Sequence, residues 1–108
     1  MIDIDERHLK TVTTILSELA PGCEVRVFGS RVAGGAKPFS DLDLALYCKG
    51  RLGFENLRLI EEAFEESDLP FRVDVLDWHS LSNSFKQAIE PQCVKLTIDE
   101  TESLNNNS

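Results

Sequence analysis

Three stretches of the chain alternate apolar and polar residues with a period of two. They run from Cys23 to Phe28, from Asp41 to Tyr47 and from Phe71 to Leu76. Since successive side chains of a strand point to opposite faces, each stretch predicts a half-buried strand with one apolar face. A chain of 108 residues has room for one compact core, so we expect the three strands to share one sheet.

Helical patterns lie before, between and after these strands. Apolar residues recur at helical spacing over residues 9–19, 54–64 and 78–90. Asp3 or Asp5 is the expected N-cap of the first helix and Asp77 that of the last. A short terminal strand is expected from Cys93 to Leu96. The pattern predicts an α+β fold, a small mixed β-sheet flanked by helices, in one domain over residues 1–96, with a flexible polar tail over residues 97–108.

The charge of the chain limits its partners. The formal net charge is −8 and the sequence pI is about 4.6. Such a chain repels a phosphate backbone at long range, because nucleic-acid binding draws on clustered Lys and Arg. Direct contact with nucleic acid is therefore not expected, and a basic protein is the better partner.

The cysteines and the hydropathy indicate the compartment. Cys23, Cys48 and Cys93 are odd in number, lie far apart in the sequence, and have no histidine at metal-ligand spacing. They predict reduced thiols in a cytosol. The N-terminus lacks a signal-peptide pattern, and no run of about 18 apolar residues occurs. We expect a cytoplasmic protein with no membrane association.

A pair of aspartates marks the second predicted strand. Asp41 and Asp43 are two residues apart, so they project from the same face. Such a pair can share one hard cation or bracket two, and carboxylates suit Mg²⁺, whose shell is completed by waters and substrate phosphates. Asp74, on the next strand, either completes the metal site or accepts the proton of an attacking hydroxyl. The sequence therefore predicts these three aspartates as catalytic and metal-binding residues.

A glycine and a serine follow the first predicted strand. Gly29 and Ser30 lie where a helix is expected to begin, and the backbone N–H groups of a helix start favour phosphate. Glycine allows close approach, and the serine hydroxyl adds a donor. Arg31 or Lys37 can supply positive charge. Ser40, which precedes the aspartate pair, either orders that loop or is a turn residue. Gly29, Ser30, Arg31 and Ser40 are the predicted nucleotide-binding residues.

These residues carry a resemblance to a known family. The segment from Gly29 to Leu44, GSRVAGGAKPFSDLDL, resembles the GSxARGxxxxxSDxDL signature of the minimal nucleotidyltransferase (MNT) family, which is polymerase-beta-like. Val73-Asp74-Val75 is similar to the third acidic strand of that family, and the matching parts cover roughly residues 9 to 96. The sequence departs from the signature at Ala33, where the family has Arg.

The resemblance implies an activity and a partner. It implies a polymerase-beta-like core, one or two Mg²⁺ ions, and transfer of a nucleoside monophosphate from an NTP with release of pyrophosphate. Many such proteins are antitoxins encoded beside a HEPN-family RNase toxin, and some move AMP from ATP to a tyrosine of that toxin. The leading interpretation is thus an antitoxin that AMPylates a HEPN toxin and forms a hetero-oligomer with it.

Two other interpretations stay open. The chain can neutralise its toxin by binding alone, with vestigial carboxylates. It can also modify a small molecule such as an antibiotic, although the lack of a second helical domain argues against this. The chain has a donor-nucleotide site and too little remaining length for an acceptor domain, so the acceptor is expected on another molecule.

Overall fold

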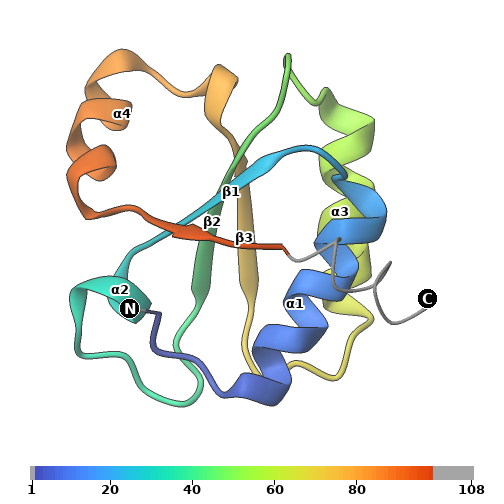
Figure 1. Cartoon of the computed structure of the whole chain (residues 1–108), viewed down its shortest axis with the longest axis vertical. Helices are drawn as coiled ribbons and strands as arrows, with labels where there is room; N and C mark the ends of the chain where they lie inside the picture. Colours follow the sequence, from blue (N-terminus) through green and yellow to red (C-terminus); the bar gives the residue numbers. More distant parts are fainter. Residues whose placement is uncertain (1, 99–108) are drawn as a thin grey trace, which may run out of the picture.

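The structure is a computed structural model that describes residues 2–98, and its elements follow the sequence pattern (Figure 1). The helices are α1 (Glu6–Leu19), α2 (Ser30–Ala33), α3 (Phe54–Glu65) and α4 (Asn83–Ile89), with 3₁₀ turns η1 (Trp78–Ser80) and η2 (Glu90–Gln92). The strands are β1 (Glu24–Phe28), β2 (Leu42–Tyr47), β3 (Val73–Asp77) and β4 (Val94–Leu96).

The strands form one mixed sheet. Their order is β3-β2-β1-β4, with β1 antiparallel to both β2 and β4, and β2 parallel to β3. The crossover from β2 to β3 is made by α3, as a parallel pair requires a long connection. The predicted α+β fold with a small mixed sheet is confirmed.

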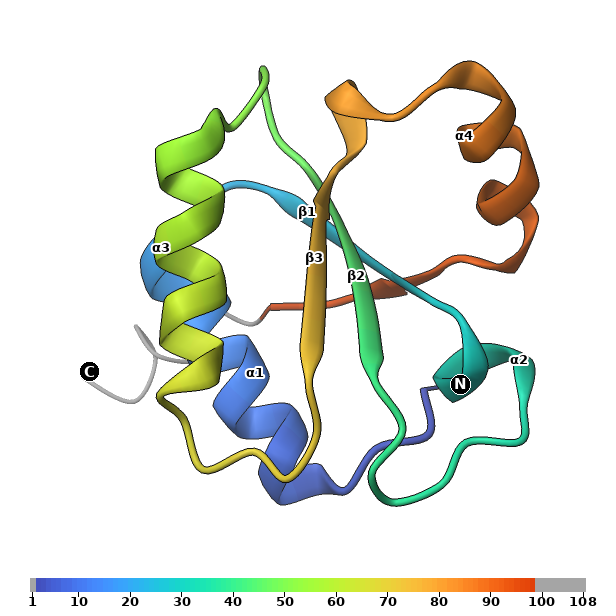
Figure 2. The ribbon, with the colours of Figure 1, turned by 180° about the vertical axis from the view of Figure 1, so that it is seen from behind.

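Helices α1 and α3 lie side by side over one face of the sheet (Figures 1 and 2). The apolar residues of the strands meet the apolar stripes of these two helices, and the largest side chains among them are fully buried. The largest of the fully buried side chains are those of Val12, Leu16, Val25, Val27, Leu42, Leu44, Leu46 and Ile60. This core fixes which face of each strand is left for polar side chains.

The opposite face is covered only in part. Ala45, Trp78 and Ile89 form a small second core under η1 and α4. The guanidinium of Arg26 lies over the rings of Tyr47 and Trp78, with centroid distances of 4.9 and 4.5 Å. These contacts fill the face near the C-terminal end of β2. The polar side chains near its N-terminal end are left outside this second core.

The prediction of a single helix after Asp77 is wrong, because a 3₁₀ turn and a separate helix form there. Asp77 does act as a cap, since its carboxylate accepts from the backbone N–H of His79 at 3.1 Å, but it caps only the turn η1. Leu81 is then extended, and Ser82 caps the separate helix α4 with its side chain. Two caps five residues apart divide the pattern, which apolar spacing alone did not reveal.

The tail predicted over residues 97–108 falls mostly outside the described residues. Of that range, the structure describes Thr97 and Ile98, and Ile98 packs against the main core. No helix among the described residues has both the length and the apolar composition needed to span a bilayer.

The structure corrects the prediction of three reduced thiols. Cys23 and Cys48 are joined by a disulfide, with their Cα atoms 4.3 Å apart. The antiparallel register pairs Glu24 with Tyr47, so the two cysteines are the next pair across the strands. Their separation of 25 residues in the sequence hid this proximity. Cys93 is a free thiol, as predicted.

We expect reduction of this disulfide to lower the free energy of unfolding by about 3 kcal/mol, because the bond closes a loop that the unfolded chain would otherwise sample freely. Thermal unfolding with and without a thiol reductant measures the loss. A Cys23→Ser/Cys48→Ser variant should melt like the reduced protein, whereas Cys93→Ser should keep the response of the wild type. Equal melting temperatures of the wild type with and without reductant would contradict the cross-link.

Candidate active site

Two of the predicted aspartates are neighbours on adjacent strands. Asp43 of β2 and Asp74 of β3 are register partners in the parallel pair, on the face that α1 and α3 leave free. Strands in a sheet lie about 4.8 Å apart, so the two carboxylates share one site. Asp41 lies immediately before β2 and is exposed. The three aspartates thus lie near the N-terminal ends of β2 and β3. This end of the sheet is the aspartate edge.

Gly29 contacts the same site from the other side. It follows β1, whose last residue Phe28 is paired with Asp43. Gly29 has φ 82° and ψ −159°, and a Cβ atom built on it would overlap Oδ2 of Asp43 and lie 3.2 Å from its Cγ. Only glycine meets both the backbone conformation and the close approach. A phosphate on this turn would therefore lie beside the carboxylate of Asp43.

Ser30 opens helix α2. The N–H groups of Val32 and Ala33 donate to the carbonyl of Gly29 at 3.1 and 2.9 Å, which forms the first turn. The helix itself supplies no acceptor for the N–H groups of its first two residues, Ser30 and Arg31. Contact of Ser30 with a phosphate stays a prediction.

Arg31 does not have the role predicted for its side chain. Its guanidinium is buried, with 5% of the residue exposed. Nη1 donates to the carbonyl of Asp3 at 2.8 Å, and Nε and Nη2 donate to that of Ser40 at 3.1 and 2.8 Å. Nη2 also donates to Pro38 O at 3.2 Å, and the guanidinium carbon lies 4.3 Å from the ring centroid of Phe71. These contacts use the guanidinium donors that were expected to bind a phosphate.

Ser40 orders the loop before the aspartates. Its hydroxyl accepts from the backbone N–H of Lys37 at 2.8 Å, while its carbonyl accepts from Arg31. Of the two roles left open, the geometry supports the ordering of this loop. Direct contact of Ser40 with a nucleotide stays a prediction.

Like charges dominate the electrostatics of the site. Burial raises the pKa of Asp43 above its usual range, and the negative charges of Asp74 and Asp41 raise it further, while Arg72 lowers it. Arg72 forms an ion pair with Asp74, from Nε to Oδ1 at 2.8 Å. Arg72 was not among the predicted site residues, although its position two residues before Asp74, on the same face of the predicted strand, was a usable signal.

The donor set fits a magnesium ion as an open site. Within residues 2–98, no three His, Cys, Asp or Glu side chains lie close enough together to hold a metal by themselves. Asp43 and Asp74 nevertheless offer hard oxygen donors side by side. Mg²⁺ commonly takes one or two carboxylates and fills its other positions with water and substrate phosphates. Joint ligation by all three aspartates stays a prediction.

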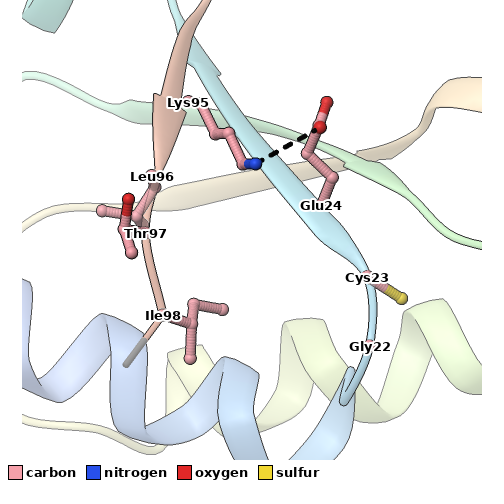
Figure 3. A pocket seen from close by; sticks show the side chains of 7 residues that line it. All are labelled: Gly22, Cys23, Glu24, Lys95, Leu96, Thr97 and Ile98. Atoms are coloured by element: carbon pink, nitrogen blue, oxygen red, sulfur yellow. Dashed lines mark ion pairs between the residues drawn. The ribbon is translucent and has the colours of Figure 1, made fainter. Parts of the chain in front are cut away.

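A hollow of about 350 Å³ lies elsewhere, around the N-terminal end of β1 and the end of β4 (Figure 3). Its walls include an ion pair between Lys95 Nζ and Glu24 Oε1 at 3.8 Å. The residues that line it are Gly22, Cys23, Glu24, Lys95, Leu96, Thr97 and Ile98. None of the predicted site residues lies in it, so the chemistry is assigned to the aspartate edge.

Comparison with known proteins identifies the family to which this chain belongs. Residues 10–101 match the family described as polymerase beta, nucleotidyltransferase, and the chain belongs to this nucleotidyltransferase family. It is 46% identical over 101 residues to the probable protein adenylyltransferase MntA of Haemophilus influenzae, a match that covers 94% of this chain and 87% of that protein. The predicted family and enzyme class are confirmed.

Solved structures show the same fold. A chain from a crystal structure of a toxin-antitoxin with AMP-PNP superposes with a TM-score of 0.71 at 22% identity, covering 87% of this chain and 76% of that chain. A chain from the tri-AMPylated Shewanella oneidensis HEPN toxin in complex with MNT antitoxin gives 0.66 at 18% identity, covering 91% and 76%. At these identities the likeness concerns the fold.

The contact of Gly29 with Asp43 predicts the result of a paired substitution. Gly29→Ala should lower nucleotidyltransferase activity by about 100-fold or more, because the new methyl group displaces the carboxylate. Gly35→Ala is the matched control, since Gly35 has φ 80° and open space around its Cβ position. That control should lose only about 1 to 2 kcal/mol of stability from backbone strain. Equal activity losses in both variants would contradict the proposed contact.

The raised pKa of Asp43 predicts a stability gain on its removal. In the unfolded chain this carboxyl titrates near pH 3.9, roughly, and a higher folded pKa means that its ionisation disfavours the folded state. Asp43→Asn should therefore raise the melting temperature of metal-free protein at about pH 7, and the gain should largely vanish at about pH 3, where the carboxyl is mostly protonated in both states. Melting in EDTA at both pH values tests this, with Asp68→Asn as an exposed control. A neutral-pH melting temperature below that of the wild type would refute it.

Proposed function

We propose that this chain is a protein adenylyltransferase that moves AMP from ATP to a tyrosine hydroxyl of a HEPN-family toxin and acts as its antitoxin. The observation that carries the proposal is the direct contact between the Gly29 turn and Asp43, with Asp74 alongside. The 46% identity to MntA over most of both chains supports the substrate class. The fold shared with chains of toxin-antitoxin structures supports the partner.

The reaction follows from where these groups lie. The backbone N–H groups of the Gly29-Ser30 turn would hold the phosphates of ATP, and Asp41 and Asp43 would hold Mg²⁺, which when bound would offset the phosphate charge. The tyrosine oxygen attacks the α-phosphorus and forms a new P–O bond. The bond from the α-phosphorus to the oxygen that bridges to the β-phosphorus breaks, and pyrophosphate leaves. Asp74 accepts the proton of the hydroxyl.

The acceptor comes from another molecule. The chain has one tyrosine, Tyr47, whose ring contacts Arg26, Trp78 and His79 four residues along β2 from Asp43. It is therefore held by its neighbours and away from the aspartate edge. The net charge of −8 suits a basic partner, because complementary charge speeds association and selects against wrong partners.

Intact mass of the partner tests the proposal. The HEPN protein incubated with this chain, ATP and Mg²⁺ should gain one or more units of about 329 Da, the mass of an AMP adduct. Asp41→Ala/Asp43→Ala should add none, while the exposed-surface variant Asp68→Ala should behave like the wild type. A stable complex with no added mass from the wild type would overturn catalysis and leave an antitoxin that acts by binding.

A further inference from the structure

Arg72 lies beside Asp74 with a hydrogen-bonded backbone and an exposed side chain. Its carbonyl accepts from the backbone N–H of Leu42 at 2.9 Å, which anchors it at the start of β3. Its side chain is 75% exposed and still reaches Asp74, whose side chain is 34% exposed, at 2.8 Å. An exposed ion pair of this kind is weak and easily exchanged.

The site needs a cation that this arginine is placed to supply. A nucleoside triphosphate brings strong negative charge to the aspartate edge, which already holds three carboxylates. The guanidinium of Arg31 is buried and bound to backbone carbonyls, and Ala33 carries no charge. Arg72 is the cation whose charge acts on Asp43. Its planar fork suits phosphate oxygens, and its exposure leaves it free to turn toward them.

We propose that Arg72 is a movable counter-ion of the active site. In the metal-free protein it pairs with Asp74. With a divalent cation held by the carboxylates, the guanidinium of Arg72 would leave Asp74 and bind the phosphates of the nucleotide. The proposal rests on the proposed function, because it assumes that a metal and a nucleotide occupy this edge.

The exchange has a signature that a merely structural role lacks. Removing the guanidinium removes a competitor of the metal and a ligand of the nucleotide, so the two affinities change in opposite directions. For Arg72→Ala we expect Mn²⁺ to bind the metal-free protein about two- to fivefold more tightly, the range of an exposed charge pair. The nucleotide should bind about fivefold or more weakly. Arg72→Lys keeps the charge and should lie between the wild type and Arg72→Ala in both.

The experiment needs no turnover. Titration of the full chain with Mn²⁺, followed by electron paramagnetic resonance of the free ion, gives the metal affinity. Calorimetry at saturating Mg²⁺ with an ATP analogue that cannot be cleaved between its α- and β-phosphates gives the nucleotide affinity. The matched control is Arg58→Ala, which removes an exposed arginine of α3 and should leave both affinities unchanged.

The outcomes separate the two proposals. Tighter Mn²⁺ binding together with weaker nucleotide binding in Arg72→Ala supports the movable counter-ion. Unchanged affinities, or losses in both, overturn the role of Arg72 while normal binding by the wild type leaves the proposed function intact. A wild-type chain that binds neither Mn²⁺ nor the analogue overturns both.

Discussion

The arrangement of the active site depends on the contacts that the buried guanidinium of Arg31 makes. A charge out of water requires partners, and this one finds them in the carbonyls of Asp3 and Ser40 and in the ring of Phe71. These groups come from the N-terminal segment, from the loop before Asp41 and from the segment before β3. One side chain therefore connects three segments, two of which lead into the strands that carry Asp43 and Asp74. The position of the aspartates follows from this connection and from the strand register.

The same edge carries an unfavourable concentration of negative charge. Asp43 is half-buried between Asp74 and Asp41, and its raised pKa reflects the cost of ionising it there. Such a cost is tolerated where it serves binding, and a bound cation with a phosphate chain would relieve it. The rest of the fold supplies the stability that the edge lacks, chiefly through leucines of β2 that are fully buried against α1 and α3.

Local pattern was enough to predict most of the fold. Period-two alternation gave the three main strands, because the buried face of β2 is the run Leu42, Leu44 and Leu46. The spacing of Gly29, Asp41 and Asp43 predicted that the glycine turn and the carboxylates belong to one site, and Gly29 does lie against Asp43. Long-range contacts were out of reach: the disulfide depends on the register of β1 with β2, and the carbonyl partners of Arg31 are set by a loop and a terminal segment. From the sequence alone, an arginine that follows a glycine-serine turn, as Arg31 does, is interpreted as a phosphate ligand, because the sequence does not show which groups surround it.

The donor half and the acceptor half of a nucleotidyl transfer make different structural demands. The donor half needs a turn that contacts phosphates and a few carboxylates, and the candidates for both lie together here, at the turn between β1 and α2 and at the starts of β2 and β3. Orientation of the acceptor is the part that demands additional surface. If a partner protein presents its own hydroxyl at the aspartate edge, binding and catalysis become one event. The specificity of the enzyme then resides in the interface, and the catalytic core can stay small.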